Sequence, residues 1–158
     1  MKTLNLLFIA ACTVVFANLS HAQTNALTDL KNDLLNNKVT RVKILHLSYG
    51  VATFVSVTPD MLDNYDHPLW TNISGNVRTT LLKAIENTTV TASNDPGDLR
   101  WGAIFYGKNS NELHSIYLDK HYTNTQTNLG RINGHIIMVN NALIGWFEMN
   151  FVPKGEKP

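Results

Sequence analysis

The chain has 158 residues, a formal net charge of +1 and one cysteine. Its length predicts a single domain that is large enough to fold without disulfides or a bound metal. A charge so close to zero, with no basic run, argues against nucleic acid and against a charged membrane surface as partners.

Residues 1–22 have the three-part layout of a secretory signal peptide. Lys2 supplies the positive start, an apolar stretch covers residues 4–17, and the small residues Ser20 and Ala22 occupy positions −3 and −1 of a cleavage site. The apolar stretch is shorter than the roughly 20 residues that a membrane-spanning helix needs. We therefore expect cleavage after Ala22, a periplasmic or secreted bacterial protein, and no membrane attachment after cleavage.

The mature chain could instead begin at Cys12, because the segment Ile9-Ala10-Ala11-Cys12 resembles a lipobox. In a lipobox the cysteine is acylated and becomes the mature N-terminus. The apolar stretch continues past Cys12, and this favours cleavage at Ala22. Residues 23–158 then contain no cysteine, so they can form no disulfide, thiol nucleophile or thiolate metal site. A disulfide-free exported domain fits a bacterial periplasm or culture medium best.

Helix signals occur at both ends of the mature chain and near its middle. Leucines spaced by three and four residues predict an amphipathic N-terminal helix. The run Thr58-Pro59-Asp60 combines a cap residue, a proline suited to the first helical position and an acid suited to the positive helix end. The predicted helices are 23–38, a short one that starts at Thr58, 77–87 and 142–151.

Strand signals come in pairs separated by turn residues, which predicts hairpins. The clearest turn is Asn133-Gly134, because both residues tolerate positive φ. Strands 99–106 and 113–120 carry apolar residues on both faces, which predicts central positions in the sheet. The predicted hairpins join 41–47 to 51–57, 99–106 to 113–120, and the residues before Asn133-Gly134 to 134–139, with a brief extended segment at 69–73 and loops at 88–98 and 122–128.

Successive strands with short turns, flanked by helices, predict an α+β fold. We expect a mostly antiparallel sheet of hairpins and meander that helices cover on one face. The expected organisation is a signal peptide (1–22), one globular domain (23–152) and a disordered tail (153–158).

Few residues have the spacing that chemistry requires. Asp119 and His121 lie two apart at a strand end, so a carboxylate could orient an imidazole base or both could ligate a metal. With His46 or His135 they suggest a small hydrolase or metal-assisted enzyme. An ordinary ion pair at a strand end explains Asp119 and His121 equally well, and a hydrogen-bonded, half-buried side chain is the simplest reading of His46 and His114. We expect no metal and no cofactor.

Aromatic and charged side chains in loops and at strand ends point to protein binding, because tryptophan and arginine are frequent interface anchors. The candidate partner-binding residues are Trp70, Arg100, Asp119, His121 and Tyr122. The sequence therefore favours an exported, non-enzymatic protein of inhibitor or immunity type whose partner is another protein, such as a bacterial toxin or enzyme. The enzyme above and a secreted host-facing factor are the alternatives.

Overall fold

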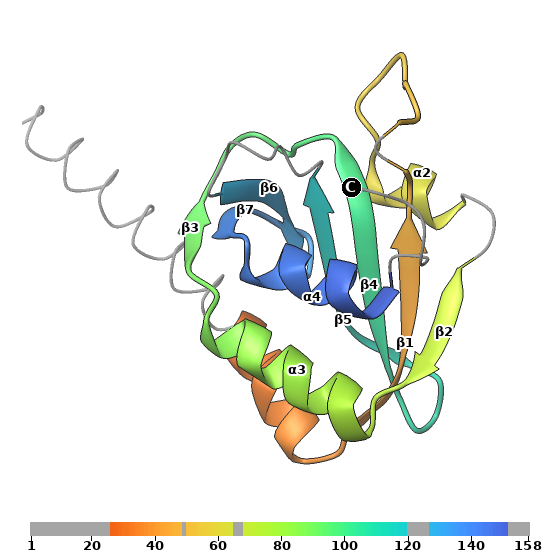
Figure 1. Cartoon of the computed structure of the whole chain (residues 1–158), viewed down its shortest axis with the longest axis vertical. Helices are drawn as coiled ribbons and strands as arrows, with labels where there is room; N and C mark the ends of the chain where they lie inside the picture. The colour runs from red at the N-terminus through yellow and green to blue at the C-terminus, as the bar shows by residue number, and fades with distance from the viewer. Residues whose placement is uncertain (1–25, 49, 65–67, 120–126, 152–158) are drawn as a thin grey trace, which may run out of the picture.

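The computed structural model describes residues 26–48, 50–64, 68–119 and 127–151 (Figure 1). The expected signal peptide and the expected C-terminal tail lie outside these ranges. No helix within them is both long and apolar enough to cross a membrane.

An antiparallel sheet forms the body of the molecule, and within the described ranges it has seven strands in the order β2-β1-β4-β5-β6-β7-β3. Strands β4 and β5 are central, as their apolar residues on both faces predict. The strands are β1 (Val39–His46), β2 (Leu69–Asn72), β3 (Val90–Ala92), β4 (Leu99–Gly107), β5 (Glu112–Asp119), β6 (Thr127–Ile132) and β7 (His135–Asn140).

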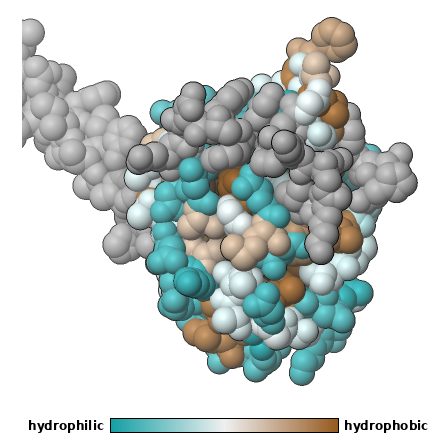
Figure 2. All heavy atoms as spheres, in the orientation of Figure 1, coloured by the Kyte–Doolittle hydropathy of each residue, from teal (hydrophilic) through white to brown (hydrophobic). Residues whose placement is uncertain are grey.

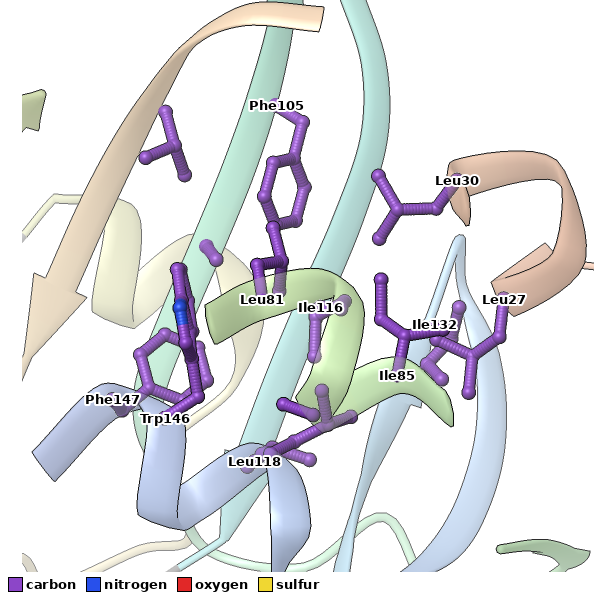
Figure 3. Packing of buried hydrophobic residues seen from close by; sticks show 14 of the residues in the cluster. Leu27, Leu30, Leu81, Ile85, Phe105, Ile116, Leu118, Ile132, Trp146 and Phe147 are labelled. Carbon is purple, nitrogen blue, oxygen red and sulfur yellow. The ribbon is translucent and has the colours of Figure 1, made fainter. Parts of the chain in front are cut away.

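Three helices cover one face of this sheet: the N-terminal helix (residues 26–35), α3 (Gly75–Glu86) and α4 (Ala142–Phe151). Their apolar stripes meet the inward side chains of the strands in one large core (Figure 3). The fold is therefore α+β, with an antiparallel sheet that the three longer helices cover on one face, as the sequence predicts. Among its largest fully buried side chains are Leu30, Leu81, Trp101, Phe105 and Phe147.

The opposite face of the sheet carries a smaller apolar cluster beneath the short helix α2 (Pro59–Asp63). Leu62 of α2 is fully buried there against strand residues that alternate with those of the large core. Thr58 caps the helix by accepting a hydrogen bond from the Met61 N–H at 3.3 Å, and Pro59 follows at the first position. The predicted helix start is confirmed. The cluster comprises Leu45, Leu47, Val57, Leu62, Leu99, Ile104 and Tyr117.

Two predicted hairpins are confirmed. Strands β4 and β5 pair antiparallel, and β6 pairs with β7 around the turn Asn133-Gly134. Both turn residues have positive φ, 47° at Asn133 and 82° at Gly134, which is why asparagine followed by glycine suits this position.

The hairpin predicted between 41–47 and 51–57 is wrong. Strand β1 instead pairs with β2 and β4, and residues 51–57 form no strand. The backbone of Val57 bonds at the start of β4: its N–H donates to the Asp98 carboxylate and its C=O accepts from the Leu99 N–H. Pairing with distant strands thus replaces the local hairpin. Residues 90–92, which the sequence placed in a loop, form strand β3 against β7.

Candidate protein-binding surface

The structure does not gather the predicted partner-binding residues on one surface. Trp70 is 48 % exposed on the edge strand β2. Arg100 and Asp119 are 2 % and 9 % exposed, and both lie at the other end of the sheet, where β4 begins and β5 ends. His121 and Tyr122 lie outside the described residues.

The structure likewise separates the described members of the hypothetical catalytic group. Asp119 follows the core residue Leu118 in β5, so its side chain points to the face without the three helices. His46 stacks on Trp101 with ring centroids 3.9 Å apart, on the helix-covered face. His135 begins β7 at the opposite end of the sheet. Within the described ranges no three histidine, cysteine or acidic residues group closely enough to hold a metal.

His114 is a buried, fully hydrogen-bonded imidazole, as the sequence suggests. Its Nε2 lies 3.0 Å from Asp33 Oδ2, and its Nδ1 lies 3.3 Å from Asn133 Nδ2. The Ser115 N–H donates to Asn133 Oδ1, which fixes the orientation of the amide. A carboxylate only accepts and an amide nitrogen only donates, so Nε2 carries the proton and Nδ1 accepts. Neither nitrogen is left to act as a base.

Asp33 lies in the N-terminal helix and contacts both this imidazole and Lys38, which follows the end of the helix. Lys38 Nζ lies 2.8 Å from Asp33 Oδ1. Hydrogen bonds from Lys38 and then from His114 lower the pKa of the Asp33 carboxyl below its ordinary value. This group therefore holds the helix on the sheet, which is a structural role.

Arg100 belongs to a clamp that fixes the segment between β1 and α2; we define the clamp as Thr53, Val57, Asp98 and Arg100. Arg100 Nη2 lies 2.5 Å from Asp98 Oδ2 and 3.3 Å from Thr53 Oγ1. The other Asp98 oxygen accepts the Val57 N–H at 2.9 Å. One buried guanidinium thus joins the beginning of β4 to the middle and the end of the segment.

The clamp is energetically demanding. Removing a guanidinium from water costs several kcal/mol, which a single ion pair recovers only in part. In the described structure Nε and Nη1 of Arg100 are buried without a hydrogen-bond partner. The fold thus accepts an unfavourable burial at the point where the segment is attached to the start of β4.

The clamped segment ends in an apolar tip, and we call residues 50–56 the apolar loop. Phe54 at the tip is fully exposed and Val55 is 63 % exposed. No charged side chain occurs from residue 48 to residue 57. Figure 1 shows the loop standing away from the sheet above α2, and Figure 2 shows its apolar colour against the mostly polar surface that this view presents. The loop combines a fixed base with an apolar end in water.

Trp70 forms a second exposed feature on the same side of the sheet as α2. Its ring lies 5.2 Å from that of Tyr106, and the Arg41 guanidinium carbon lies 5.2 Å from the Trp70 ring centre. Arg41 Nη2 donates to Ser110 Oγ at 2.9 Å, which holds the guanidinium in place. Burial raises the pKa of the Tyr106 hydroxyl. We call Arg41, Trp70 and Tyr106 the edge patch.

Sequence reasoning missed Phe54 and Val55 because it read their segment as a strand. A signal against that strand was present: apolar residues occupy both alternating sets, with Val51, Val55 and Val57 in one and Phe54 in the other. A strand packed on a core by one face alternates apolar and polar residues. The mixed pattern suited an exposed loop as well as a strand.

Comparisons of this chain with protein-family models, with curated proteins and with solved structures find no match.

Proposed function

We propose that this protein is an exported, non-enzymatic binding domain, of inhibitor or immunity type, that holds another protein through the apolar loop. The observation that carries the proposal is the fully exposed Phe54 at the end of a clamped segment. Burying a phenylalanine side chain stabilises by roughly 1.5–3 kcal/mol. An apolar cavity on a partner would supply that burial, which the fold itself does not.

The clamp favours binding because it reduces the entropy that the apolar loop would lose on association. A loop that must be fixed during association loses free energy for each side chain it immobilises. Asp98 and Arg100 hold the base of the apolar loop before any partner arrives. Aromatic anchors of this kind carry much of the binding energy in protein interfaces.

Export supports the choice among binding functions. The signal-like residues 1–22 direct the proposal to a periplasmic or secreted partner, for which a bacterial toxin or enzyme is the expected class. No cofactor enters the proposal.

Site-specific photocrosslinking in the producing cell tests the loop. A photoreactive amino acid replaces Phe54 in one strain and the exposed residue Lys83 of α3, on the helix-covered face, in a control strain. We expect one defined protein adduct from position 54 and none from position 83. Adducts of equal yield at both positions, or none at position 54 while the protein accumulates, would contradict the proposal.

A further inference from the structure

Strand β2 forms an edge of the sheet that no other described strand pairs with. It is the terminal strand, and among the described residues it pairs only with β1. The Ile73 N–H donates to the Thr40 C=O, so every second residue of β2, Thr71 and Leu69, continues that ladder. The N–H and C=O of Trp70 and the N–H of Asn72 therefore point outward, away from β1.

Within β2 this edge lacks three of the devices that usually prevent pairing, although the strand is short, with four residues. Leu69–Asn72 contains no charged residue, proline or bulge, and proline occurs only before it, at Pro68. Leu69 is exposed on the helix-covered side and Trp70 on the other side. An added strand would find apolar surface on both faces.

The edge patch adds a charge that has no acidic partner among the residues that the structure describes. The ion pairs within the described structure assign Lys43 to Asp63 and none to Arg41. The Arg41 guanidinium lies over the Trp70 ring and donates to the neutral Ser110 hydroxyl. A guanidinium offers five N–H donors, so most remain for a carboxylate.

We propose that β2 accepts an extended segment of the partner protein as an additional antiparallel strand, and that this segment carries a carboxylate that pairs with Arg41. The partner residue that bonds to Trp70 would place its side chain on the same face of the sheet as the Trp70 ring and Arg41. Neighbouring strands lie about 4.8 Å apart, so a carboxylate at that residue would come close to the Arg41 guanidinium. The two neighbours of that residue would lie on the other face, one opposite Leu69 and one opposite the methyl-bearing Thr71. The segment recognised is therefore an apolar residue, an acid and an apolar residue in succession.

This inference rests on the proposed protein-binding function, because it states which second element of the partner is held. Main-chain pairing supplies the affinity and alternate side chains the specificity, as in other complexes formed by strand addition. The apolar loop and the edge patch lie at different ends of β1, so a partner could engage either one independently.

The test uses the purified, ¹⁵N-labelled chain and an end-capped synthetic peptide with the core valine–glutamate–valine. We expect NMR shifts at the amides of Trp70 and Asn72 and slower hydrogen exchange at both. A valine–glutamine–valine peptide should bind about tenfold more weakly, because a charge-assisted hydrogen bond is lost. A peptide N-methylated on the bonding side should not bind.

Variants separate this inference from the proposed function. Arg41→Gln should abolish the preference for glutamate over glutamine, and Lys108→Gln, a charge change in an exposed turn, should leave it unchanged. Phe54→Ser should not alter peptide binding. Equal affinity for both peptides, shifts away from β2, or concentration-dependent shifts at Trp70 without peptide would overturn the inference, the last because a second copy would then occupy the edge. A specific adduct at position 54 would leave the proposed function standing.

Discussion

Arg100 is a charge that the fold removes almost completely from water, and Asp98 is its one acidic partner among the described residues. Removing one member of a buried pair leaves the other charge uncompensated, which is far costlier than removing both. We therefore predict that Asp98→Ala lowers the free energy of unfolding by about 3 kcal/mol, partly through loss of the bond to the Val57 N–H.

Combining Asp98→Ala with Arg100→Met should recover part of that loss, because methionine fills the space without a charge. Urea unfolding of the wild type, both single variants and the double variant measures the coupling. Additive losses in the double variant would show that Asp98 and Arg100 are not energetically coupled, which would contradict the clamp.

Asp33 makes a pH-dependent contribution to the stability of the fold. Hydrogen bonds from Lys38 and His114 place the pKa of its carboxyl below the ordinary value of 3.8. A depressed pKa in the folded state stabilises the fold above the unfolded pKa, and this stabilisation is lost as the pH falls through the folded pKa. We predict that Asp33→Asn is less stable than wild type near neutral pH and that the difference shrinks below pH 3.8.

Urea midpoints across an acid pH series measure this effect. Asp29→Asn is the matched control, since it removes an exposed carboxylate of the same helix that forms none of the described ion pairs. A difference between wild type and Asp33→Asn that stays constant at all pH values would contradict the assignment.

At the scale of elements, the sequence predicted what local chemistry decides. The turn Asn133-Gly134 and the polar turn between β4 and β5 fix hairpins through neighbouring residues alone. Strand β1 differs, since its partners lie far along the chain and its register depends on them. Strand β3 has three residues, too few for an alternation to be recognised.

The candidate site likewise depends on contacts between residues that are far apart in the sequence. The exposure of Trp70 follows from its place on an edge strand, which is a property of the assembled sheet. The burial of Arg100 depends on a register shift between Leu99 and Trp101 and on the position of Thr53. Neither is encoded in local spacing, and thus residue type alone could nominate these side chains without placing them.

The apolar loop should contribute to binding without contributing to stability. Phe54 is fully exposed, so Phe54→Ser should change the free energy of unfolding by less than about 0.5 kcal/mol. Phe105, fully buried in the large core, is the matched phenylalanine, and Phe105→Ala should cost about 3–5 kcal/mol. Thermal and urea unfolding compare the two. A large loss in Phe54→Ser would mean that the loop packs on its own fold.

At the scale of the whole molecule, the N-terminal helix, α3 and α4 lie on one face of the sheet, and the opposite face carries the α2 cluster, the clamp and the edge patch. The clamped loop leaves from the end of β1 next to the start of β4, and β2 pairs with the other part of β1. Two candidate contacts are thus attached to one strand. A single partner that spans β1 could use both, with an effective concentration set by the rigid sheet.

The location of the mature protein tests the premise of an exported partner, and the single cysteine makes the test decisive. Cleavage after Ala22 removes Cys12, so the mature protein should carry no thiol and should have the mass of residues 23–158. Acylation at Cys12 would instead give a larger mass and a protein that partitions into detergent. We predict a thiol-free protein in the periplasm or the culture medium, to be checked by intact mass, thiol titration after denaturation and cell fractionation. Recovery of the uncleaved chain from the cytoplasm would remove the exported toxin or enzyme as the partner class, while the adduct at position 54 would still report whether the apolar loop binds a protein.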